Sequence, residues 1–354
     1  MLGRKSKALV GLDIGSSAVK VVQLHRSGGD YRVTAVGVEP LPVDSVIDST
    51  VIDTGVVRDV VRRAFNRLNI KTREVAVALS GSGVIVKKLL LPPMTDEELQ
   101  TSIQWEARQH IPFESRDVSL DYQVMGTSTS GLREASMKVL LVAAKKDRVE
   151  AYTSVVEQAG CIPVVLDLDA LALQNAYELN YGVHDGEVEV LANAGASVIN
   201  LNVVQGRQSL FTRDVAIGGN AYTEAIKKEL DLDFEDAELL KKGVPVGGVT
   251  YEDADPVIQA VTQTLLQEVS KTLDFFRATV ATDQLDRIVL SGGTSRIEGL
   301  SGALSDRFDT EVELFDPFRQ VAADPGVLND DQRMDLAPLV AVAMGLALRR
   351  ASDR

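Results

Sequence analysis

The sequence contains very little cysteine and histidine. Its 354 residues include one cysteine, Cys161, and three histidines, His25, His110 and His184. A single cysteine excludes an internal disulfide, and three separated histidines without a second cysteine give none of the usual zinc-ligand spacings. We therefore expect Cys161 to be a small buried apolar residue, and we expect no protein metal cage.

Long apolar runs and an excess of positive charge are also missing. The longest apolar stretches, such as residues 338–348, fall short of the ~20 residues needed to cross a bilayer, and the N-terminus lacks the pattern of a cleavable signal. The formal net charge of −14 argues against a broad nucleic-acid-binding surface, which needs clustered Lys and Arg. With 45% hydrophobic residues, the chain is long enough for two packed domains. We expect a globular cytoplasmic protein.

A strand-turn-strand pattern occurs twice. The stretch VGLDIGSSAVKVVQL contains Asp13, and VLANAGASVINLNVV contains Asn193 at the corresponding position, 193 − 13 = 180 residues later. The alignment also pairs the turn residues of the two copies, Gly15 with Gly195 and Ser17 with Ser197. An offset of about half the chain indicates a duplicated domain with a cleft between the halves.

Alternating apolar residues in the first third predict a small mixed sheet. Antiparallel strands are expected at residues 9–15, 18–26 and 31–41, followed by an amphipathic helix at 56–69 and a further strand at 74–81. The second copy of the motif begins the same order of strands again near Gly186.

The pattern of predicted elements changes after residue 87. A capping box predicts a helix at 95–110, and it is followed by alternating strands at 117–126 and 135–144 and by a helix at 147–160. We interpret this region as an inserted subdomain. Its Trp105 is compatible either with packing or with a partner-docking surface.

These patterns together predict an α/β fold with two duplicated lobes around a cleft. The expected divisions are a first lobe of residues 1–86 with 163–185 and 338–354, an inserted subdomain of 87–162, a second-lobe core of 186–217 with 286–337, and an upper part of the second lobe at 218–285. Two capped helices and a long helix at 256–278 are expected in this upper part.

The repeated turn suits a phosphate chain. Glycine permits the special backbone angles that point N–H groups at phosphate oxygens, and Ser16 and Ser17 add hydroxyl donors. Asp13 at the strand end can sit beside a hydrated Mg²⁺, and Lys20 can reach back to the β- or γ-phosphate. Taken alone, such a turn is weak evidence and more typical of an ordinary β-hairpin. The repeat and the distal loop SGGTS favour the phosphate interpretation.

Four motifs in the right order resemble the actin-like ATPase superfamily. GLDIGSSAVKVV and LANAGASVINLNV resemble its two phosphate loops, LSGGTSRIEGL its adenosine loop, and LVAVAMGLALR its closing connecting helix. Within the FtsA-like branch, the insertion PPMTDEELQTSIQWEARQHIPF is similar to that of the PilM family. Members of that family are cytoplasmic actin-like components of the type IV pilus inner-membrane platform.

The resemblance implies a complete ATP and Mg²⁺ site. The implied contacts are Asp13 to Mg²⁺, Gly15, Ser16, Ser17 and Lys20 around the phosphates, Gly195, Ala196 and Ser197 from the opposite lobe, Gly218 and Gly219 at a helix start, Glu238 and Lys241 at the ribose and base, and Gly292, Gly293 and Thr294 under the adenosine. Without this context, Glu238 and Lys241 read as an ordinary surface ion pair on a helix.

Two positions depart from the pattern of active superfamily members. Position 193 is Asn where the family pattern has Asp, which removes one negative charge beside Mg²⁺ and the attacking water. Asp169 stands where several active members carry a Glu or Gln that orients this water, and Asp is shorter by one methylene. We therefore treat Asn193 and Asp169 as weak catalytic residues and expect tight ATP binding with slow or absent hydrolysis.

The resemblance implies an ATP-binding adaptor at the inner face of the bacterial inner membrane. Its implied partners are the cytoplasmic N-terminal tail of PilN, in a groove near the inserted subdomain, and other pilus platform and motor proteins; self-association is also possible. The alternating strand at 137–144 is expected to offer an edge for this tail. Two alternatives remain: a membrane-associated actin-like filament of the cell-division type, and a small-molecule kinase on the same fold.

Overall fold

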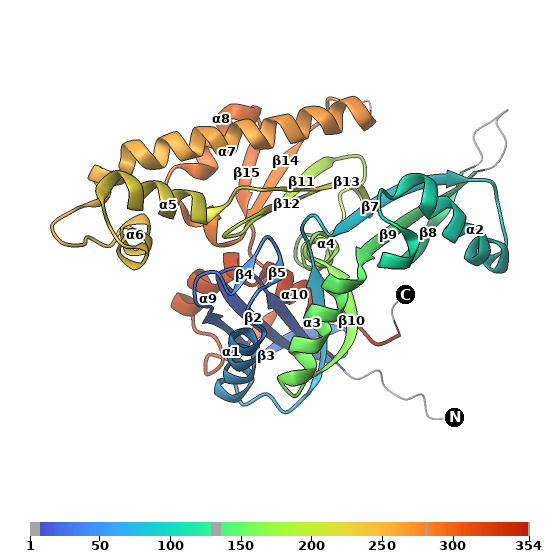
Figure 1. Ribbon diagram of the computed structural model, residues 1–354, viewed down its shortest axis with the longest axis horizontal. Coiled ribbons are helices and arrows are strands. Elements are labelled where there is room, and N and C mark those ends of the chain that lie inside the picture. The colour runs from blue at the N-terminus through green and yellow to red at the C-terminus, as the bar shows by residue number, and fades with distance from the viewer. Residues whose placement is uncertain (1–7, 129–135, 281, 353–354) are drawn as a thin grey trace.

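Two mixed β-sheets, each built around one copy of the repeated hairpin, organise the chain (Figure 1). The computed structural model describes residues 8–128, 136–280 and 282–352. The first sheet has the strand order β10-β6-β1-β2-β3-β16 and the second has the order β13-β12-β11-β14-β15. In both sheets an antiparallel three-stranded meander is extended on one side by two parallel strands, and in the first sheet β16 also pairs in parallel with β3 on the other side. The predicted duplication is therefore present in the topology.

The two sheets are built from the following strands. The first sheet contains β1 (Val10–Ile14), β2 (Ala18–Ser27), β3 (Asp30–Pro40), β6 (Glu74–Leu79), β10 (Ile162–Leu168) and β16 (Ala322–Ala323). The second contains β11 (Val188–Ala194), β12 (Ile199–Gln205), β13 (Gln208–Val215), β14 (Arg287–Ser291) and β15 (Glu311–Leu314). A short hairpin of β4 (Val46–Ile47) and β5 (Thr50–Val51) lies between β3 and the first helix.

Helices cover the first sheet on one face and separate the two lobes on the other. The apolar face of α1 (Thr54–Arg67) packs with α3 (Lys146–Gln158) against the sheet, and Cys161 is buried in the same core, as expected. Between the lobes, α4 (Asp169–Tyr181) and α10 (Ala341–Ala347) pack closely and join a core shared by both sheets. Gly345 permits this approach, because an added Cβ would lie 1.7 Å from the carbonyl oxygen of Ala172.

The second lobe carries a long helix along its sheet. Figure 1 shows α7 (Tyr251–Val280) running past β11 to β14, with α8 (Leu300–Phe308) beside it and α5 (Gly219–Leu230) and α6 (Phe234–Lys241) at one end. The sequence predicted that this helix begins at Pro256. It begins at Tyr251, because Asp253 accepts hydrogen bonds from the Thr250 amide and hydroxyl and closes the first turn. Pro256 is therefore the sixth residue of the helix and lies inside it, where it cannot donate the i→i−4 hydrogen bond.

The inserted subdomain is a three-stranded sheet covered by one helix. It contains β7 (Val84–Leu91), α2 (Asp96–His110), the 3₁₀ turn η1 (Ser115–Asp117), β8 (Val118–Ser128) and β9 (Ser136–Lys145). Thr95 and Glu98 form the predicted capping box of α2. In Figure 1 this unit projects from the side of the first lobe. Trp105 is 60% exposed on α2, so it contributes little to the core.

Two details of the insert differ from the predictions. The strand at 137–144 lies in β9, which pairs with β7 on one side and with β8 on the other, so the expected free edge does not exist. The helix α3, placed by the sequence in the insert, packs instead in the core of the first lobe through Tyr152 and Val155. The insert as a packed unit therefore ends with β9 rather than at residue 162.

Three short elements remain, one after β14 in the second lobe and two before α10. They are the 3₁₀ turn η2 (Gly293–Arg296), the helix α9 (Asp330–Leu336) and the 3₁₀ turn η3 (Ala337–Leu339). Among the described residues, every helix is either too short or too polar to span a bilayer.

Candidate functional site

The two repeated turns have the same hydrogen bonding. The Gly15 amide donates to the Ala18 carbonyl at 3.1 Å, and the Gly195 amide donates to the Val198 carbonyl at 2.9 Å. Each bond closes a tight turn between two antiparallel strands, which leaves Ser16 with Ser17, or Ala196 with Ser197, at the tip. Short side chains at these tips allow a ligand to approach the backbone.

A pair of facing side chains stands beneath each turn. In the first lobe, Asp13 of β1 faces Lys20 of β2, and the Asp13 Oδ2 to Lys20 Nζ distance is 3.1 Å. In the second lobe, Asn193 of β11 faces Asn200 of β12 and donates to it at 3.1 Å. The first turn therefore has a charged pair beneath it, and the second has a neutral one.

Three predicted segments of the second lobe are locked together around the second turn. The Gly219 amide and the Thr294 hydroxyl both donate to the Gly195 carbonyl, at 3.0 and 2.7 Å. Gly218 and Gly292 are required by close backbone contact. An added Cβ would lie 2.4 Å from the Gly195 oxygen in the first case and 2.2 Å from the Ala194 oxygen in the second. Gly292 of the adenosine loop and Gly218 at the start of α5 thus both allow the backbone to pack closely against the second turn.

Glu238 and Lys241 form a partly buried pair on α6. Their side chains form an ion pair, and both bond to the Thr223 hydroxyl, which lies 2.8 Å from Lys241 Nζ. Lys241 also donates to the Gly219 carbonyl at 3.2 Å. Burial lowers the pKa of Lys241. An exposed helical ion pair would make none of these additional contacts, so the surface interpretation of this pair is wrong.

A cleft of about 700 Å³ lies between the lobes and gathers most of the predicted residues. This volume lies within the range of small-molecule sites. The predicted residues that line it are Ser16, Ser17, Lys20, Asn193, Gly195, Ala196, Ser197, Gly219, Glu238, Lys241, Gly292, Gly293 and Thr294. Asp13, Gly15, Gly218 and Asp169 do not line it. Asp13 contacts the cleft residue Lys20, and Gly218 contacts the turn at Gly195.

Asp169 lies at the first position of α4, close to Asp13. Burial, with the nearby carboxylate of Asp13 as the next contribution, raises the pKa of Asp169 to about 7. A hydrogen bond from Ser80 and the charge of Lys20 act in the opposite direction. The first lobe therefore holds two neighbouring carboxyl groups close to the cleft residue Lys20, and one of them changes its charge near neutral pH.

The structure adds cleft residues that the sequence did not indicate. They include Asn220, Phe234, Lys242, Tyr251, Arg296 and Glu298 in the second lobe and an apolar wall of Val38, Pro40, Leu41, Val43, Val46 and Ile47 in the first. Arg296 and Glu298 lie within the predicted adenosine-loop motif LSGGTSRIEGL, but contacts were assigned only to its Gly292, Gly293 and Thr294. The apolar wall has no local signal, because its residues come from the end of β3, from β4 and from the loop between them, and they share no motif.

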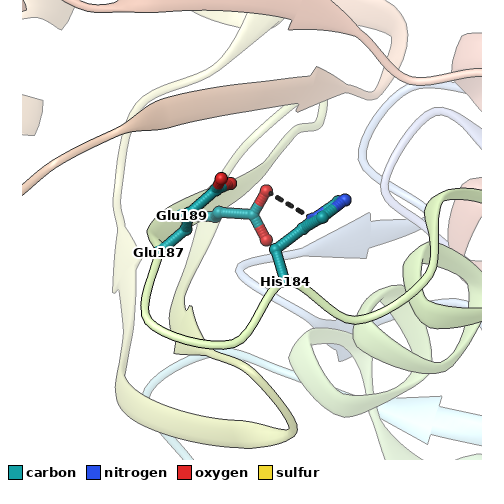
Figure 2. Close-up of side chains that lie close together, drawn as sticks. All are labelled: His184, Glu187 and Glu189. Carbon is teal, nitrogen blue, oxygen red and sulfur yellow. Dashed lines mark ion pairs between the residues drawn. The ribbon is translucent and has the colours of Figure 1, made fainter.

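A second polar cluster lies away from the cleft. Figure 2 shows His184, Glu187 and Glu189 close together, with an ion pair between His184 and Glu189. The guanidinium of Arg287 lies 2.7 Å from Glu189 and 3.7 Å from Glu187, and the Tyr177 hydroxyl also donates to Glu189. Arg287 supplies the positive charge that a metal ion would bring. We therefore interpret this cluster as a polar contact between α4 and the second sheet.

Comparison with known proteins agrees with this geometry. A family model described as type IV pilus assembly protein PilM matches residues 11–351. The cell division protein FtsA of Enterococcus hirae is 24% identical over 92% of this chain and 82% of its own length, and FtsA of Streptococcus pneumoniae serotype 2 is 22% identical over 87% and 75%.

Solved structures of the same architecture include one pilus complex. A PilM-PilN type IV pilus biogenesis complex superposes with a TM-score of 0.86 at 29% identity, covering 99% of this chain and all of that chain. MreB5 of Spiroplasma citri bound to ADP superposes with a TM-score of 0.53 at 12% identity, covering 96% and 94%, and supports the fold alone. The fold is thus that of the actin-like ATPases. The match along nearly its whole length shows that this chain belongs to the PilM family of type IV pilus assembly proteins.

Proposed function

We propose that this protein is an ATP-binding adaptor of the type IV pilus assembly complex, located at the cytoplasmic face of the inner membrane. The observation that supports ATP binding best is the pair of matching turns on opposite sides of one cleft, each with short residues at its tip. The lining offers a cation, Lys20, hydroxyl groups and exposed turn backbone, which suits a phosphate chain with its bound Mg²⁺. Membership of the PilM family supports the pilus role.

In this proposal the two ends of the cleft hold different parts of the nucleotide. Ser16, Ser17 and Lys20 bind the phosphates from one side, and Ala196 and Ser197 bind them from the other. Asp13 holds Mg²⁺ through water, and this ion neutralises phosphate charge. Glu238, Lys241 and the loop 292–294 hold the ribose and base.

Hydrolysis is expected to be slow. Asn193 is neutral, so the charge beside Mg²⁺ and the attacking water is reduced by one relative to an Asp. Loss of one aligned group in phosphoryl transfer reduces the rate by about 100- to 1,000-fold, whereas the many other contacts preserve binding. ATP then serves to set the angle between the lobes and so the shape that partners meet.

The nucleotide proposal is tested by purifying the wild type and Asn193→Asp without added nucleotide. We expect ATP or ADP to co-purify with the wild type, and we expect little phosphate release from it with Mg²⁺-ATP. The Asp variant should release phosphate at least about tenfold faster. A wild type that neither carries nor binds nucleotide would refute ATP binding. Steady turnover comparable to motor ATPases would refute the slow-hydrolysis part alone.

For the partner, we propose that the PilN cytoplasmic tail adds to the outer edge of β10. This strand ends the first sheet, and none of the described residues pairs with its outer side. Ile162, Val164 and Leu166 alternate along it and are 56, 36 and 36% exposed, so an apolar row borders the free edge. The helix α3, which follows the insert strand β9 directly, packs beside β10. An extended peptide with alternating apolar residues fits such an edge.

Binding of a PilN tail peptide by fluorescence polarisation tests this assignment. Val164→Lys places a charge in the exposed row of an edge strand, which folded proteins tolerate, and is expected to weaken binding at least about tenfold. The matched control is Leu314→Lys, because Leu314 is 54% exposed on β15, the edge strand of the second sheet. Equal loss of binding in both variants, or in neither, would refute the β10 site.

A further inference from the structure

One hydrogen bond crosses from the second lobe to the base of the inserted subdomain. Asp214, near the end of β13, accepts this bond through Oδ2 from the backbone amide of Gly81 at 2.5 Å. Gly81 lies in the loop between β6 and β7, directly before the strand that enters the insert. The two residues are 133 positions apart, so this bond joins parts of the chain that are otherwise packed in different cores.

The other oxygen of Asp214 leads to the phosphate end of the cleft. Oδ1 accepts from Asn200 Nδ2 at 2.8 Å, and Asn200 Oδ1 accepts in turn from Asn193 Nδ2 at 3.1 Å. Asn200 is buried, so water does not readily replace either bond. Asn193 lines the cleft. One carboxylate is thus bonded toward the cleft on one side and toward the insert on the other.

The loop that contains Gly81 connects to the insert through both of its strands. Gly81 begins the turn into β7, and the backbone amide of Lys145, the last residue of β9, donates to the Gly83 carbonyl at 2.9 Å. The neighbouring Ser80 hydroxyl bonds to Asp169 at the start of α4. A displacement of this loop therefore moves the strand that enters the insert and the strand that leaves it together.

We propose that Asp214 couples nucleotide occupancy at Asn193 to the position of the inserted subdomain, with Asn200 as the intermediate. This inference rests on the nucleotide binding proposed above. A phosphate oxygen in the cleft that accepts the second Nδ2 hydrogen of Asn193 reorients this amide relative to Asn200. Asn200 satisfies both Asn193 and Asp214 in only one orientation of its amide, so a change at Asn193 reaches Asp214 and then the Gly81 amide. Asp214 is a positioning residue in this scheme, because it does not line the cleft.

Hydrogen exchange of the full-length protein tests the coupling at Gly81. In the wild type, saturating Mg²⁺-ATP is expected to change the exchange rate of peptides covering residues 79–84 by about tenfold, which corresponds to ~1.4 kcal/mol of opening free energy. Asp214→Ala removes both bonds and should abolish this response while ATP still binds. Asn200→Ala leaves the Asp214 to Gly81 bond in place and should abolish the response as well.

The control is a matched carboxylate that lies within one lobe. Asp286 accepts from the Val188 amide at 2.6 Å, both residues being in the second lobe, so Asp286→Ala should retain the nucleotide response at residues 79–84. If Asp214→Ala does not fold, Asp214→Asn serves in its place. The NH2 group of this asparagine must face either the Gly81 N–H or the Asn200 N–H, and two donors cannot form a hydrogen bond, so one of the two bonds is lost.

The outcomes separate this inference from the proposed function. A wild type that binds ATP without any change at residues 79–84 would overturn the coupling and leave nucleotide binding standing. The coupling would also be overturned if the Asp214 and Asn200 variants responded like the wild type. A wild type that binds no nucleotide would overturn both proposals. Loss of the nucleotide response in both the Asp214 and the Asn200 variants, with the response retained in Asp286→Ala, would support the coupling.

Discussion

Asn193 and Asn200 face each other across β11 and β12, with Asn193 Nδ2 3.1 Å from Asn200 Oδ1. The corresponding positions of the first lobe, 193 − 180 and 200 − 180, hold Asp13 and Lys20, which form an ion pair of the same length. The duplicated turns thus share their geometry and differ in charge. This difference allows the role of position 193 to be tested through stability as well as through activity.

Asn193→Asp is expected to destabilise the protein in the absence of nucleotide. The single Asn200 amide would then face two carboxylates, at positions 193 and 214, and only one of them can receive its N–H donor. We expect a loss of about 1–3 kcal/mol in the free energy of unfolding, measured by urea denaturation. Mg²⁺-ATP should reduce the loss, because the cation offsets the added charge.

The first lobe indicates a second substitution that should compensate for Asn193→Asp. The double variant Asn193→Asp, Asn200→Lys reproduces the Asp13 and Lys20 pair and should recover most of the lost stability, with a coupling between the two substitutions that exceeds about 0.5 kcal/mol. Additive effects in the double variant would contradict this account of the pair.

The raised pKa of Asp169 predicts a pH-dependent stability. Its folded-state pKa is about 7, because of burial and then the Asp13 charge, against an ordinary value of ~3.9 in the unfolded chain. The folded state therefore binds the proton more tightly. The resulting stabilisation is fully present below about pH 4 and is lost as the pH rises through about 7. Asp169→Asn lacks this loss, so its Tm should rise relative to the wild type between pH 5 and pH 8.

A scan of Tm against pH checks this sign. The exposed acid Asp306 on α8 supplies the control, since Asp306→Asn should follow the wild-type curve at every pH. A gap between Asp169→Asn and the wild type that stays constant, or closes toward high pH, would show that Asp169 is not held protonated in the folded state.

Gly292→Ala is expected to disrupt the adenosine loop. Gly292 has φ +86°, and an added Cβ would lie 2.2 Å from the Ala194 backbone oxygen, so both the backbone angle and the contact oppose any side chain. We expect a loss of more than about 2 kcal/mol of stability, with weaker nucleotide binding. Gly302→Ala in α8 is the matched control: an added Cβ there meets nothing within 4 Å, and the helix should gain up to about 1 kcal/mol.

The sequence predicted the repeated turns well because their signal is local. A glycine and two short residues between alternating strands specify a tight turn wherever they occur, and both turns formed with the same bond, from Gly15 to Ala18 and from Gly195 to Val198. The helix starts at Thr95 and Asp233 were predictable for the same reason, because each cap bonds to a residue three positions away.

Predictions that depended on which elements become neighbours were less successful. Alternation along β9 indicated its two faces correctly but carries no information about its two edges, so its central place between β7 and β8 was missed. The apolar face of α3 likewise predicted that this helix packs against another element, but it could not predict that this element is α1. Asp214 was missed because a single acid at a strand end has no pattern. Its bond to Asn200 lies across the β12 and β13 hairpin, but its bond to Gly81 joins residues 133 positions apart.

Thr223→Val is expected to weaken nucleotide binding without loss of the fold. The Thr223 hydroxyl bonds both members of the Glu238 and Lys241 pair, and valine keeps its shape while removing these bonds. A hydrogen bond to a charged group contributes about 1.5–3 kcal/mol, so the ATP Kd measured by calorimetry should rise by at least about tenfold as the pair loses its fixed geometry.

The control for this substitution lies in the same subdomain. Thr262, like Thr223, is buried on a helix, but its hydroxyl bonds to the Tyr222 hydroxyl at 3.1 Å and to the Ile258 carbonyl rather than to the Glu238 and Lys241 pair. Thr262→Val should cost similar stability and leave the ATP Kd within about twofold of the wild type. If both variants bound ATP equally well, Glu238 and Lys241 would be a structural pair, and the base end of the site would have to be sought among Phe234, Arg296 and Tyr251.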